Sequence, residues 1–392
     1  MLPEYSNVWQ QLVSYPFTGP VQIMMDEKFS VALDVSALCV KYPTGIAVYA
    51  RGFIDELLRR PDQIDLDYYF KGKLFREYSH FFDGLKTPQR YVMKSVVPRT
   101  GKQITHSLDK RFLLDHRAIN IATIHDVTYF VQGNYVESWI PKRFKSKIAR
   151  SNAKIVKYAD KIVTVSESTR TDLCRIYNVD PDRVRVIYPG FQPVSLAVSS
   201  ENDEAILEKF DQSRQSYFLF AGRIELAKNI LSMIEAFKAS GLDKDLNFLI
   251  AGPSEPDTEF IHKRTIELGM AHTVKFPGYV SSEELAALYR NAKAFIFPTY
   301  YEGFGMPILE SMSNGVPVLV GSRGAAPEIA GGHGIVADPF SVEEIKNGML
   351  KLAEGGHDPD RLKAHAASFT WPRFVDQVFD LYRELLAARR SQ

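Results

Sequence analysis

Two glutamates, Glu302 and Glu310, flank a seven-residue segment whose composition points to chemistry. Gly303, Gly305 and Pro307 lie between them. Two nearby carboxylates are compatible with acid–base catalysis, with a metal site or with a pocket that recognises hydroxyl groups. Pro307 suits the first position of a helix, where a missing amide proton costs nothing. We therefore expect Glu310 in the first helical turn and Glu302 on the preceding loop.

The start of this helix follows the apolar run 292–300, which we expect to be a strand of a parallel sheet. Ligands bind at the carboxyl ends of such strands, where free amide protons and the positive end of a helix dipole converge. That place suits an anion, yet the sequence puts two carboxylates there. Because ionised carboxylates only accept hydrogen bonds, their expected targets are the hydroxyl groups of a sugar or a ribose.

Cations suited to a phosphate lie near the end of another expected strand. Arg223 and Lys228 belong to the segment "AGRIELAKN", which begins within the apolar run 216–224 and continues beyond it. A guanidinium and an ammonium group at this position could clamp a diphosphate. Each of these side chains alone is common on protein surfaces. The conjunction of two cations with Glu302 and Glu310 indicates a site for a diphosphate and for hydroxyl groups.

The elements that must position these residues alternate regularly in the second half of the chain. Short apolar runs end in Gly, Pro or polar residues, and between them lie segments with apolar residues three and four apart, such as "NILSMIEAFKAS" and "SSEELAALYRNA". Strand alternating with helix predicts a parallel sheet covered on both faces, that is, a doubly wound α/β domain. The expected strands are 216–224, 246–253, 272–280, 292–300 and 316–322.

The first half of the chain is less regular but repeats the same signature, so we expect a second Rossmann-like sheet. The expected strands lie within 28–36, 119–127, 160–168 and 182–190, and the expected helices within 44–60 and 148–159. The polar segment 191–206 is expected to link the domains. We therefore expect domains over residues 1–193 and 194–370 that face one cleft, followed by an amphipathic helix over 371–392 that needs a partner surface.

The length and composition are those of an ordinary globular chain. A length of 392 residues favours two domains over one. Two cysteines, Cys39 and Cys174, make a disulfide framework or a cysteine-built metal site improbable, which fits a reducing compartment. The amino terminus shows no secretion signal, and no run approaches the ~18 uninterrupted apolar residues of a spanning helix. We therefore expect a cytoplasmic protein.

Charge is distributed unevenly along the chain, although the formal net charge is only +1. Residues 1–190 carry 28 Lys/Arg against 20 Asp/Glu, and the remainder carries 20 against 27. The segment 142–161 has eight Lys/Arg and one Asp. It could lie on the anionic inner face of a membrane with Phe144, Ile148 and Val156 inserted, or it could be a solvated helix whose apolar stripe packs on its own sheet.

Several segments together resemble the retaining glycosyltransferases of the family-four type, also called group 1 glycosyltransferases, which have the two-domain GT-B architecture. The segment "YEGFGMPILESMSNGVPVL" resembles their Glu-x7-Glu motif, and "GRIELAKN" their Gly-Arg…Lys-Asn segment. "IHDV" is similar to their mid-domain His segment, "VSESTRTDL" to their Ser-bearing turn and "TGIAVYARGF" to their first glycine-bearing loop. The resemblance implies that the terminal helix crosses back onto the first domain, whereas segment 62–115 carries nothing diagnostic.

The resemblance implies a role for each matching side chain in holding the donor. Arg223 and Lys228 would bind the donor diphosphate, and Glu310 the ribose hydroxyls. Glu302 would contact the hydroxyls of the transferred sugar. His125 would lie across the cleft, near the reacting centre.

Backbone groups and one aromatic side chain would complete the donor site. The backbone of Phe304, Gly305 and Met306 would help to place sugar and phosphate, and Gly45 would let the first loop approach the donor. Many family members carry two glycines in that loop where this sequence has one, which leaves open how closely the backbone reaches the phosphate. Tyr279, in "PGYVSS", would stack on the nucleobase or remain a surface aromatic.

Retaining transfer without a carboxylate nucleophile implies that the leaving diphosphate stays beside the incoming hydroxyl and helps to accept its proton. Arg223 and Lys228 would offset the charge of the departing diphosphate, so we expect no metal ion and no cofactor. Of the Asp-x-Asp triplets, which could suggest a metal site, only Asp65 and Asp67 precede an apolar run. The others fall in turn-like segments, where aspartate is common for conformational reasons.

Other functions and substrates stay open at this point. A nicotinamide-dependent oxidoreductase would also be doubly wound, but no Gly-x-Gly-x-x-Gly follows the first strand of either half. A sugar-nucleotide epimerase or a non-catalytic binding protein would share the architecture. By analogy we expect a mannosyltransferase that uses GDP-mannose, with a UDP-hexose as the alternative donor and a growing glycan on a polyprenyl diphosphate as the acceptor. Nucleic acid is not an expected partner.

Overall fold

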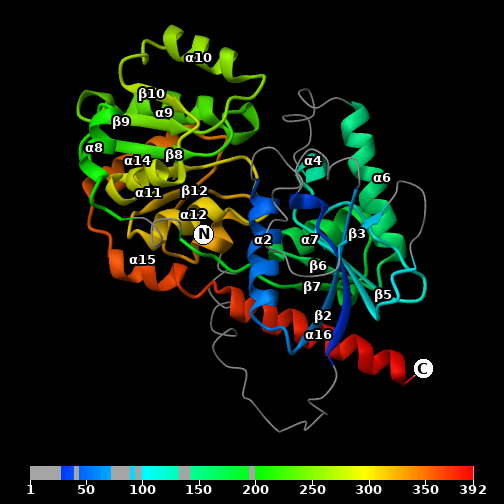
Figure 1. Cartoon of the computed structure of the whole chain (residues 1–392). Coiled ribbons are helices and arrows are strands. Elements are labelled where there is room, and N and C mark those ends of the chain that lie inside the picture. The colour runs from blue at the N-terminus through cyan, green and yellow to red at the C-terminus, as the bar shows by residue number, and fades with distance from the viewer. Residues whose placement is uncertain are drawn as a thin grey trace.

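The computed structural model describes residues 28–38, 44–71, 89–92, 99–131, 142–193 and 199–391. These residues form two sheets flanked by helices, and the two α/β units lie side by side (Figure 1). Every strand pair in both sheets is parallel. The expectation of two doubly wound α/β domains is therefore confirmed.

The first sheet has seven strands in the order β3-β2-β1-β4-β5-β6-β7. Its centre is apolar and covered on both faces, since all six residues of β5 (Ile119–Ile124) are buried. The other strands are β1 (Phe29–Asp34), β2 (Ile64–Lys71), β3 (Gln89–Val92), β4 (Ile104–Ser107), β6 (Lys161–Thr164) and β7 (Val184–Val186). The helical segments are η1 (Ser36–Leu38), α2 (Gly45–Leu58), α4 (Thr128–Val131), α6 (Lys142–Tyr158), α7 (Glu167–Tyr177) and η3 (Pro181–Arg183).

The second sheet has six strands in the order β10-β9-β8-β11-β12-β13. Its central strands β8 (Tyr217–Ala221) and β11 (Ala294–Phe297) are buried throughout. The other strands are β9 (Asn247–Ala251), β10 (Val274–Gly278), β12 (Val318–Gly321) and β13 (Ile335–Ala337). The helical segments are α8 (Asp203–Lys209), η5 (Leu226–Lys228), α9 (Ile230–Ser240), η6 (Leu242–Lys244), α10 (Thr258–Glu267), α11 (Ser282–Asn291), α12 (Met306–Ser313), α13 (Ala326–Ala330), α14 (Val342–Glu354) and α15 (Pro359–Ala366).

The last helix, α16 (Trp371–Arg390), leaves the second α/β unit and runs beneath the first (Figure 1). It packs on α2 so closely that a Cβ atom at Gly52 would lie 2.1 Å from the Trp371 indole ring. The buried hydroxyl of Tyr382 lies 2.7 Å from Nδ1 of His106 on β4. These contacts give the apolar face of α16 its partner surface and confirm that the terminal helix crosses back.

The sequence pattern missed four strands: β2, β3, β4 and β13. β2 places Asp65 and Asp67 between apolar residues, and β4 contains the buried polar residues Thr105, His106 and Ser107. Neither segment therefore shows a continuous apolar run. In addition, α6 begins six residues before the expected helix 148–159, and the expected linker 191–206 includes the first turn of α8.

The apolar stripe of α6 packs on its own sheet, which decides between the two alternatives for this basic helix. Ile148 is 6% exposed, and Ile155 is fully buried. Ile155 joins a core cluster with residues of β5 and β6, and Val156 packs against the same cluster. The alternative in which the helix packs on its own sheet therefore holds, and the one in which Ile148 and Val156 insert into lipid does not. The side chain of Phe144 lies outside the described residues.

Candidate active site

The carboxyl ends of the two sheets meet directly. His125 and Asp126 follow β5 of the first sheet, and Glu302 and Gly303 lie on the loop after β11 of the second. A Cβ atom at Gly303 would lie 2.1 Å from the carbonyl oxygen of His125 and 2.8 Å from Cβ of Asp126. Glycine is required here because any side chain at this position would push the two strand ends apart. The structure thus places His125 beside the loop that carries Glu302.

A short ion pair links two of the expected donor-binding side chains. Nζ of Lys228, at the end of η5, lies 2.7 Å from Oε1 of Glu302. The Lys228 side chain is 20% exposed and that of Glu302 is 14% exposed, so the pair is largely shielded from water. A cation suited to a phosphate and a carboxylate suited to hydroxyl groups therefore occupy adjacent places at the strand ends.

Arg223 is the second expected cation, and it follows a glycine at which two neighbouring strand ends come very close together. A Cβ atom at Gly252, after β9, would lie 1.7 Å from the carbonyl oxygen of Gly222, after β8. The Arg223 side chain is half exposed and pairs with Glu225 at 2.9 Å and Glu255 at 3.6 Å. A bound diphosphate would have to share this guanidinium with both carboxylates.

Glu225 connects the two cations electrostatically. Burial raises the pKa of its carboxyl group, while Arg223 and Lys228 both act to lower it. Arg223 and Lys228 therefore both lie close to one half-buried carboxylate. Nothing in the sequence singles out Glu225, because a glutamate between two basic residues is common on surfaces.

The helix that follows Glu302 begins one residue earlier than expected, which places Glu310 just beyond its first turn. Gly305 is its N-cap, with a φ of 102°, and Pro307 occupies the second helical position of α12. Glu310 is the fifth residue of α12, so its predicted place in the first turn is wrong. Phe304 is 8% exposed and turns its ring toward Phe369, at 6.0 Å between ring centroids. It can face a ligand only through its backbone, as the resemblance implied.

A pocket of about 200 Å³ lies at the carboxyl ends of β8 and β9. Its lining is mostly apolar and includes Tyr279, Leu285, Tyr289, Pro307 and Glu310. Tyr279 is 64% exposed, so its ring is accessible to a ligand that enters. An apolar slot with one carboxylate in its wall suits a nucleobase with a ribose beside it.

Glu310 and Tyr289 influence each other inside this pocket. Burial raises the pKa of the Glu310 carboxyl group, and the Tyr289 hydroxyl acts to lower it. Within the described residues, the Tyr289 hydroxyl is buried and has no partner at normal hydrogen-bond geometry. It nevertheless lies close enough to Glu310 for that carboxylate to raise the pKa of Tyr289. The sequence placed Tyr289 on an amphipathic helix but gave no signal for this role.

His125 has a defined protonation state. Its Nε2 atom lies 2.8 Å from the carbonyl oxygen of Leu108, which can only accept, so Nε2 carries the hydrogen. Burial is the main cause that lowers its pKa. The imidazole is therefore neutral near pH 7, and Nδ1 is left as a hydrogen-bond acceptor. The edge of the Tyr49 ring, 4.7 Å away between centroids, helps to fix the ring plane.

Gly45 is the first residue of α2 and is exposed, and among the described residues no atom beyond its own chain neighbours lies within 4 Å of a Cβ atom built on it. The preceding Thr44 is the N-cap, and its hydroxyl accepts a hydrogen bond from the amide of Ala47 at 3.4 Å. The described residues therefore leave the space beside Gly45 unfilled. Met306, the first residue of α12, is half-buried and packs against the core, so its side chain is structural.

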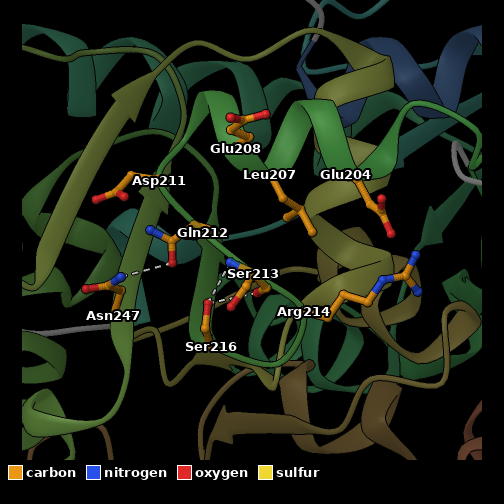
Figure 2. Close-up of a pocket in the computed structure, with 9 residues that line it drawn as sticks. All are labelled: Glu204, Leu207, Glu208, Asp211, Gln212, Ser213, Arg214, Ser216 and Asn247. Atoms are coloured by element: carbon orange, nitrogen blue, oxygen red, sulfur yellow. Dashed lines mark hydrogen bonds between the residues drawn. The ribbon is translucent and has the colours of Figure 1, made fainter.

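A wider hollow of about 790 Å³ lies at the opposite, amino-terminal end of β8 and β9 (Figure 2). Asn247, the first residue of β9, forms part of its lining. Figure 2 shows the carboxylates of Glu204, Glu208 and Asp211 around it, together with the guanidinium of Arg214. Three carboxylates do not suit a diphosphate, and none of the expected site residues lines this hollow.

The Asp-x-Asp triplet that could suggest a metal site is engaged by a lysine instead. Nζ of Lys102 lies 2.6 Å from Asp65 and 3.6 Å from Asp67. Across the described ranges, no group of three or more His, Cys, Asp or Glu side chains is arranged to hold a metal ion. Among the helices in the described part of the chain, none is long and apolar enough to cross a membrane.

The first domain also contains an acid that the sequence did not single out. Asp34 ends β1 and accepts a hydrogen bond from the Ser36 amide at 2.8 Å. Burial raises its pKa to about 6, and the Asp109 carboxylate acts in the same direction. Asp109 also acts on the pKa of His125. Asp34, Asp109 and His125 therefore belong to one edge of the first sheet, the edge that faces the Glu302 loop.

Several known proteins are similar to this chain. "O-antigen chain mannosyltransferase B" of Escherichia coli is 29% identical over 281 residues, which cover 70% of this chain and 73% of that protein. "O-antigen chain mannosyltransferase RfbU" of Salmonella typhimurium is 27% identical over 256 residues, which cover 65% of this chain and 67% of that protein.

Solved structures share the whole fold at low sequence identity. Sucrose-phosphate synthase from Thermosynechococcus elongatus matches with a TM-score of 0.69 at 17% identity, covering 92% of this chain and 100% of that one. Anabaena HepE in complex with UDP matches with a TM-score of 0.68 at 17% identity, with the same coverage. This likeness shows the GT-B arrangement of two Rossmann-like domains.

Family descriptions match both halves of the chain. Residues 43–193 match "Glycosyltransferase Family 4", and residues 202–369 match "Glycosyl transferases group 1". The two matches together span most of the chain, and they include the strand ends that carry His125, Arg223 and Glu302. The chain therefore belongs to the group 1 glycosyltransferases, with a family 4 amino-terminal domain and the GT-B fold.

Proposed function

We propose that this glycosyltransferase moves mannose from GDP-mannose to a growing glycan, with retention of the anomeric configuration. Two of its relatives are named as O-antigen chain mannosyltransferases, which supports the choice of sugar. The observation that carries the proposal is the Lys228–Glu302 ion pair at 2.7 Å. It puts a group suited to a phosphate beside a group suited to sugar hydroxyls, at the place where the two domains meet.

The donor is proposed to lie across the strand ends of the second sheet. Its nucleobase occupies the pocket of about 200 Å³ near Tyr279, and its ribose hydroxyls donate hydrogen bonds to Glu310. Its diphosphate lies on Arg223 and Lys228, in place of part of their contacts with neighbouring carboxylates. The mannose then reaches Glu302 and the amide end of α12, where the first turn of a helix leaves backbone amides without intrahelical acceptors.

The proposed reaction uses the departing diphosphate as the base. The bond between the anomeric carbon and the diphosphate oxygen breaks, and the acceptor oxygen bonds to that carbon from the same face. The acceptor proton passes to the departing phosphate oxygen. Arg223 and Lys228 stabilise the charge that develops there, so the proposal needs no metal ion. Nδ1 of His125 accepts a hydrogen bond from a hydroxyl of the sugar and helps to orient it.

The proposed acceptor is a glycan or an oligosaccharide on a polyprenyl diphosphate. Such an acceptor would bring the enzyme to a membrane surface, and the exposed face of α6 supports this. Lys147, Arg150, Lys154 and Lys157 all lie on that face and are exposed. Because the apolar stripe of α6 is packed inside the domain, contact with anionic lipid would be electrostatic and without insertion.

A UDP-hexose is the second candidate donor. The specific observation in its favour is the shared fold with Anabaena HepE, which was solved with UDP. The same four side chains would serve, because a diphosphate and a ribose are common to both donors. The distinction rests on the nucleobase pocket.

The test is a calorimetric panel of GDP, UDP, ADP and dTDP in EDTA, followed by product analysis. The proposal predicts that GDP binds most tightly, that the chelator does not abolish binding, and that GDP-mannose yields an α-linked mannoside by NMR only when a glycan acceptor is present. Tightest binding of UDP would favour the second donor. An epimerised sugar nucleotide formed without acceptor would contradict transfer.

A further inference from the structure

The start of α7, in the first domain, is capped by a carboxylate from the second domain. Oε1 of Glu328 on α13 accepts the amide hydrogen of Glu167 at 2.8 Å, and Oε2 accepts that of Ser168 at 3.1 Å. The hydroxyl of Tyr188, also in the first domain, donates to Oε1 at 2.6 Å. The positive end of the α7 dipole and three donors therefore converge on one side chain from across the interface.

The same helix start also holds the loop that carries Glu302. The Ser166 hydroxyl donates to the carbonyl oxygen of Gly303 at 2.7 Å. The Thr169 hydroxyl lies 3.3 Å from the carbonyl oxygen of His125 and 3.4 Å from that of Gly303. Ser166 and Thr169 are both fully buried. These two hydroxyls thus bridge the two strand ends on which the site is built.

The backbone that leads into the helix of Glu328 packs directly on the backbone of Glu302. The amide of Ala325 donates to the carbonyl oxygen of Glu302 at 2.9 Å. A Cβ atom at Gly324 would lie 2.6 Å from that oxygen and 2.8 Å from the Glu302 amide nitrogen. The start of α13 is therefore fixed to the Glu302 backbone, and wherever α7 holds Glu328, it also places Glu302.

A further contact lies along the same face of α7. The buried Tyr301, which precedes Glu302, donates its hydroxyl hydrogen to Asp172 at 2.8 Å. The first domain therefore forms hydrogen bonds with loop 301–303 on both sides of Glu302 and with α13 through Glu328. None of these contacts involves Arg223, Lys228 or the nucleobase pocket.

We propose that Glu328 is a positioning residue for glycosyl transfer, which clasps α7 across the domain interface and so sets Glu302 against His125. This inference rests on the proposed function of that site. Glu328 touches neither donor nor acceptor in this proposal. Its loss should leave donor binding intact and impair the step in which both domains must contribute.

The experiment compares Glu328→Gln with two companions. Glutamine keeps the size of the side chain but offers one acceptor oxygen where two amides need acceptors. We expect kcat for transfer to fall by about tenfold or more, with the Kd for GDP close to that of wild type. Tyr188→Phe, which removes one of the three donors, should show a smaller loss of kcat.

The matched control is Asp203→Asn. Asp203 is an equally partnered carboxylate in the second domain, bound to Arg290 and Asn291, and it does not line the proposed donor pocket. This variant should lower Tm while kcat per folded molecule stays near the wild-type value. Equal losses of kcat in Glu328→Gln and Asp203→Asn would overturn the proposal, because the effect would then be one of general stability.

Hydrogen exchange separates this inference from the proposed function. In Glu328→Gln, the amides at the start of α7 and in loop 301–303 should exchange faster, while β8 and β9 keep their protection. This readout needs no substrate, so it stands even if wild-type protein fails to transfer mannose. Unchanged exchange at α7, or an unchanged kcat with an active wild type, would refute the clasp.

Discussion

Replacing Gly303 with alanine tests whether the two domains must touch at the site. Gly303 does not adopt a left-handed conformation, so alanine suits its backbone. The added Cβ atom would nevertheless lie 2.1 Å from the His125 carbonyl oxygen and 2.8 Å from Cβ of Asp126. Neither neighbour is the end of a flexible side chain. The clash therefore has to be relieved by moving the strand ends apart.

The size of this movement gives the expected effect. Ordinary contact with a Cβ atom begins at 3.4 Å, so the His125 carbonyl group must retreat by about 1.3 Å. A misplacement of about 1 Å between reacting groups lowers a rate by about 100-fold, which corresponds to about 2.7 kcal/mol of transition-state stabilisation. Binding of GDP should stay close to wild type, since its proposed contacts lie within the second domain.

The assay measures kcat for mannosyl transfer and the Kd for GDP in parallel. Gly348→Ala is the matched control, because its Cβ atom would lie 2.5 Å from Cδ1 of Leu319, inside the second domain and away from the interface. That variant should change Tm and leave kcat per folded molecule unaltered. If Gly303→Ala turns over at the wild-type rate, the site does not require close approach of His125 and the Glu302 loop.

Three further predictions follow from the side chains. Lys228→Met should weaken GDP binding by about 10- to 100-fold, because it removes a charge-assisted hydrogen bond worth about 1.5–3 kcal/mol. The control Lys346→Met breaks a 2.7 Å ion pair on α14 and should leave GDP binding unchanged, so equal Kd values for the two variants would contradict the assignment. Because the pKa of Glu310 is raised, lowering the pH should weaken GDP binding already at pH values above the range in which an ordinary glutamate protonates. Titration calorimetry should find no such pH dependence in Glu310→Gln. Burial lowers the pKa of His106 to about 3, so between about pH 6.5 and pH 3 the unfolded chain binds a proton that the folded chain does not. This residue alone should make the free energy of unfolding about 2 kcal/mol smaller at pH 5 than at pH 7. Urea melts in which His106→Asn keeps the wild-type pH dependence would count against this prediction.

The places of the candidate side chains in the second domain were largely predictable because their signals are local. A helix start after a buried strand places Glu302, and the strand end at Arg223 places the cations, without knowledge of any distant contact. The position of Glu310 in its helix was misjudged by one residue because helix boundaries depend on the cap, here Gly305.

The contacts between the domains were not predictable from the sequence. Glu328 lies in an ordinary helical segment, and its partners at the start of α7 are 160 or more residues away. The Ser-bearing turn was visible as a motif, yet nothing in it says that Ser166 holds Gly303. The strands β2 and β4 were missed for a related reason: their buried polar residues, such as Asp67 and His106, are satisfied only by the tertiary fold.

The most direct test of the whole account is the structure of a complex with GDP. The account predicts that the diphosphate contacts Arg223 and Lys228, that a ribose hydroxyl donates to Glu310, and that the guanine base lies in the pocket beside Tyr279. A nucleotide bound elsewhere, for example in the wide hollow beside Glu204 and Asp211, would contradict the account.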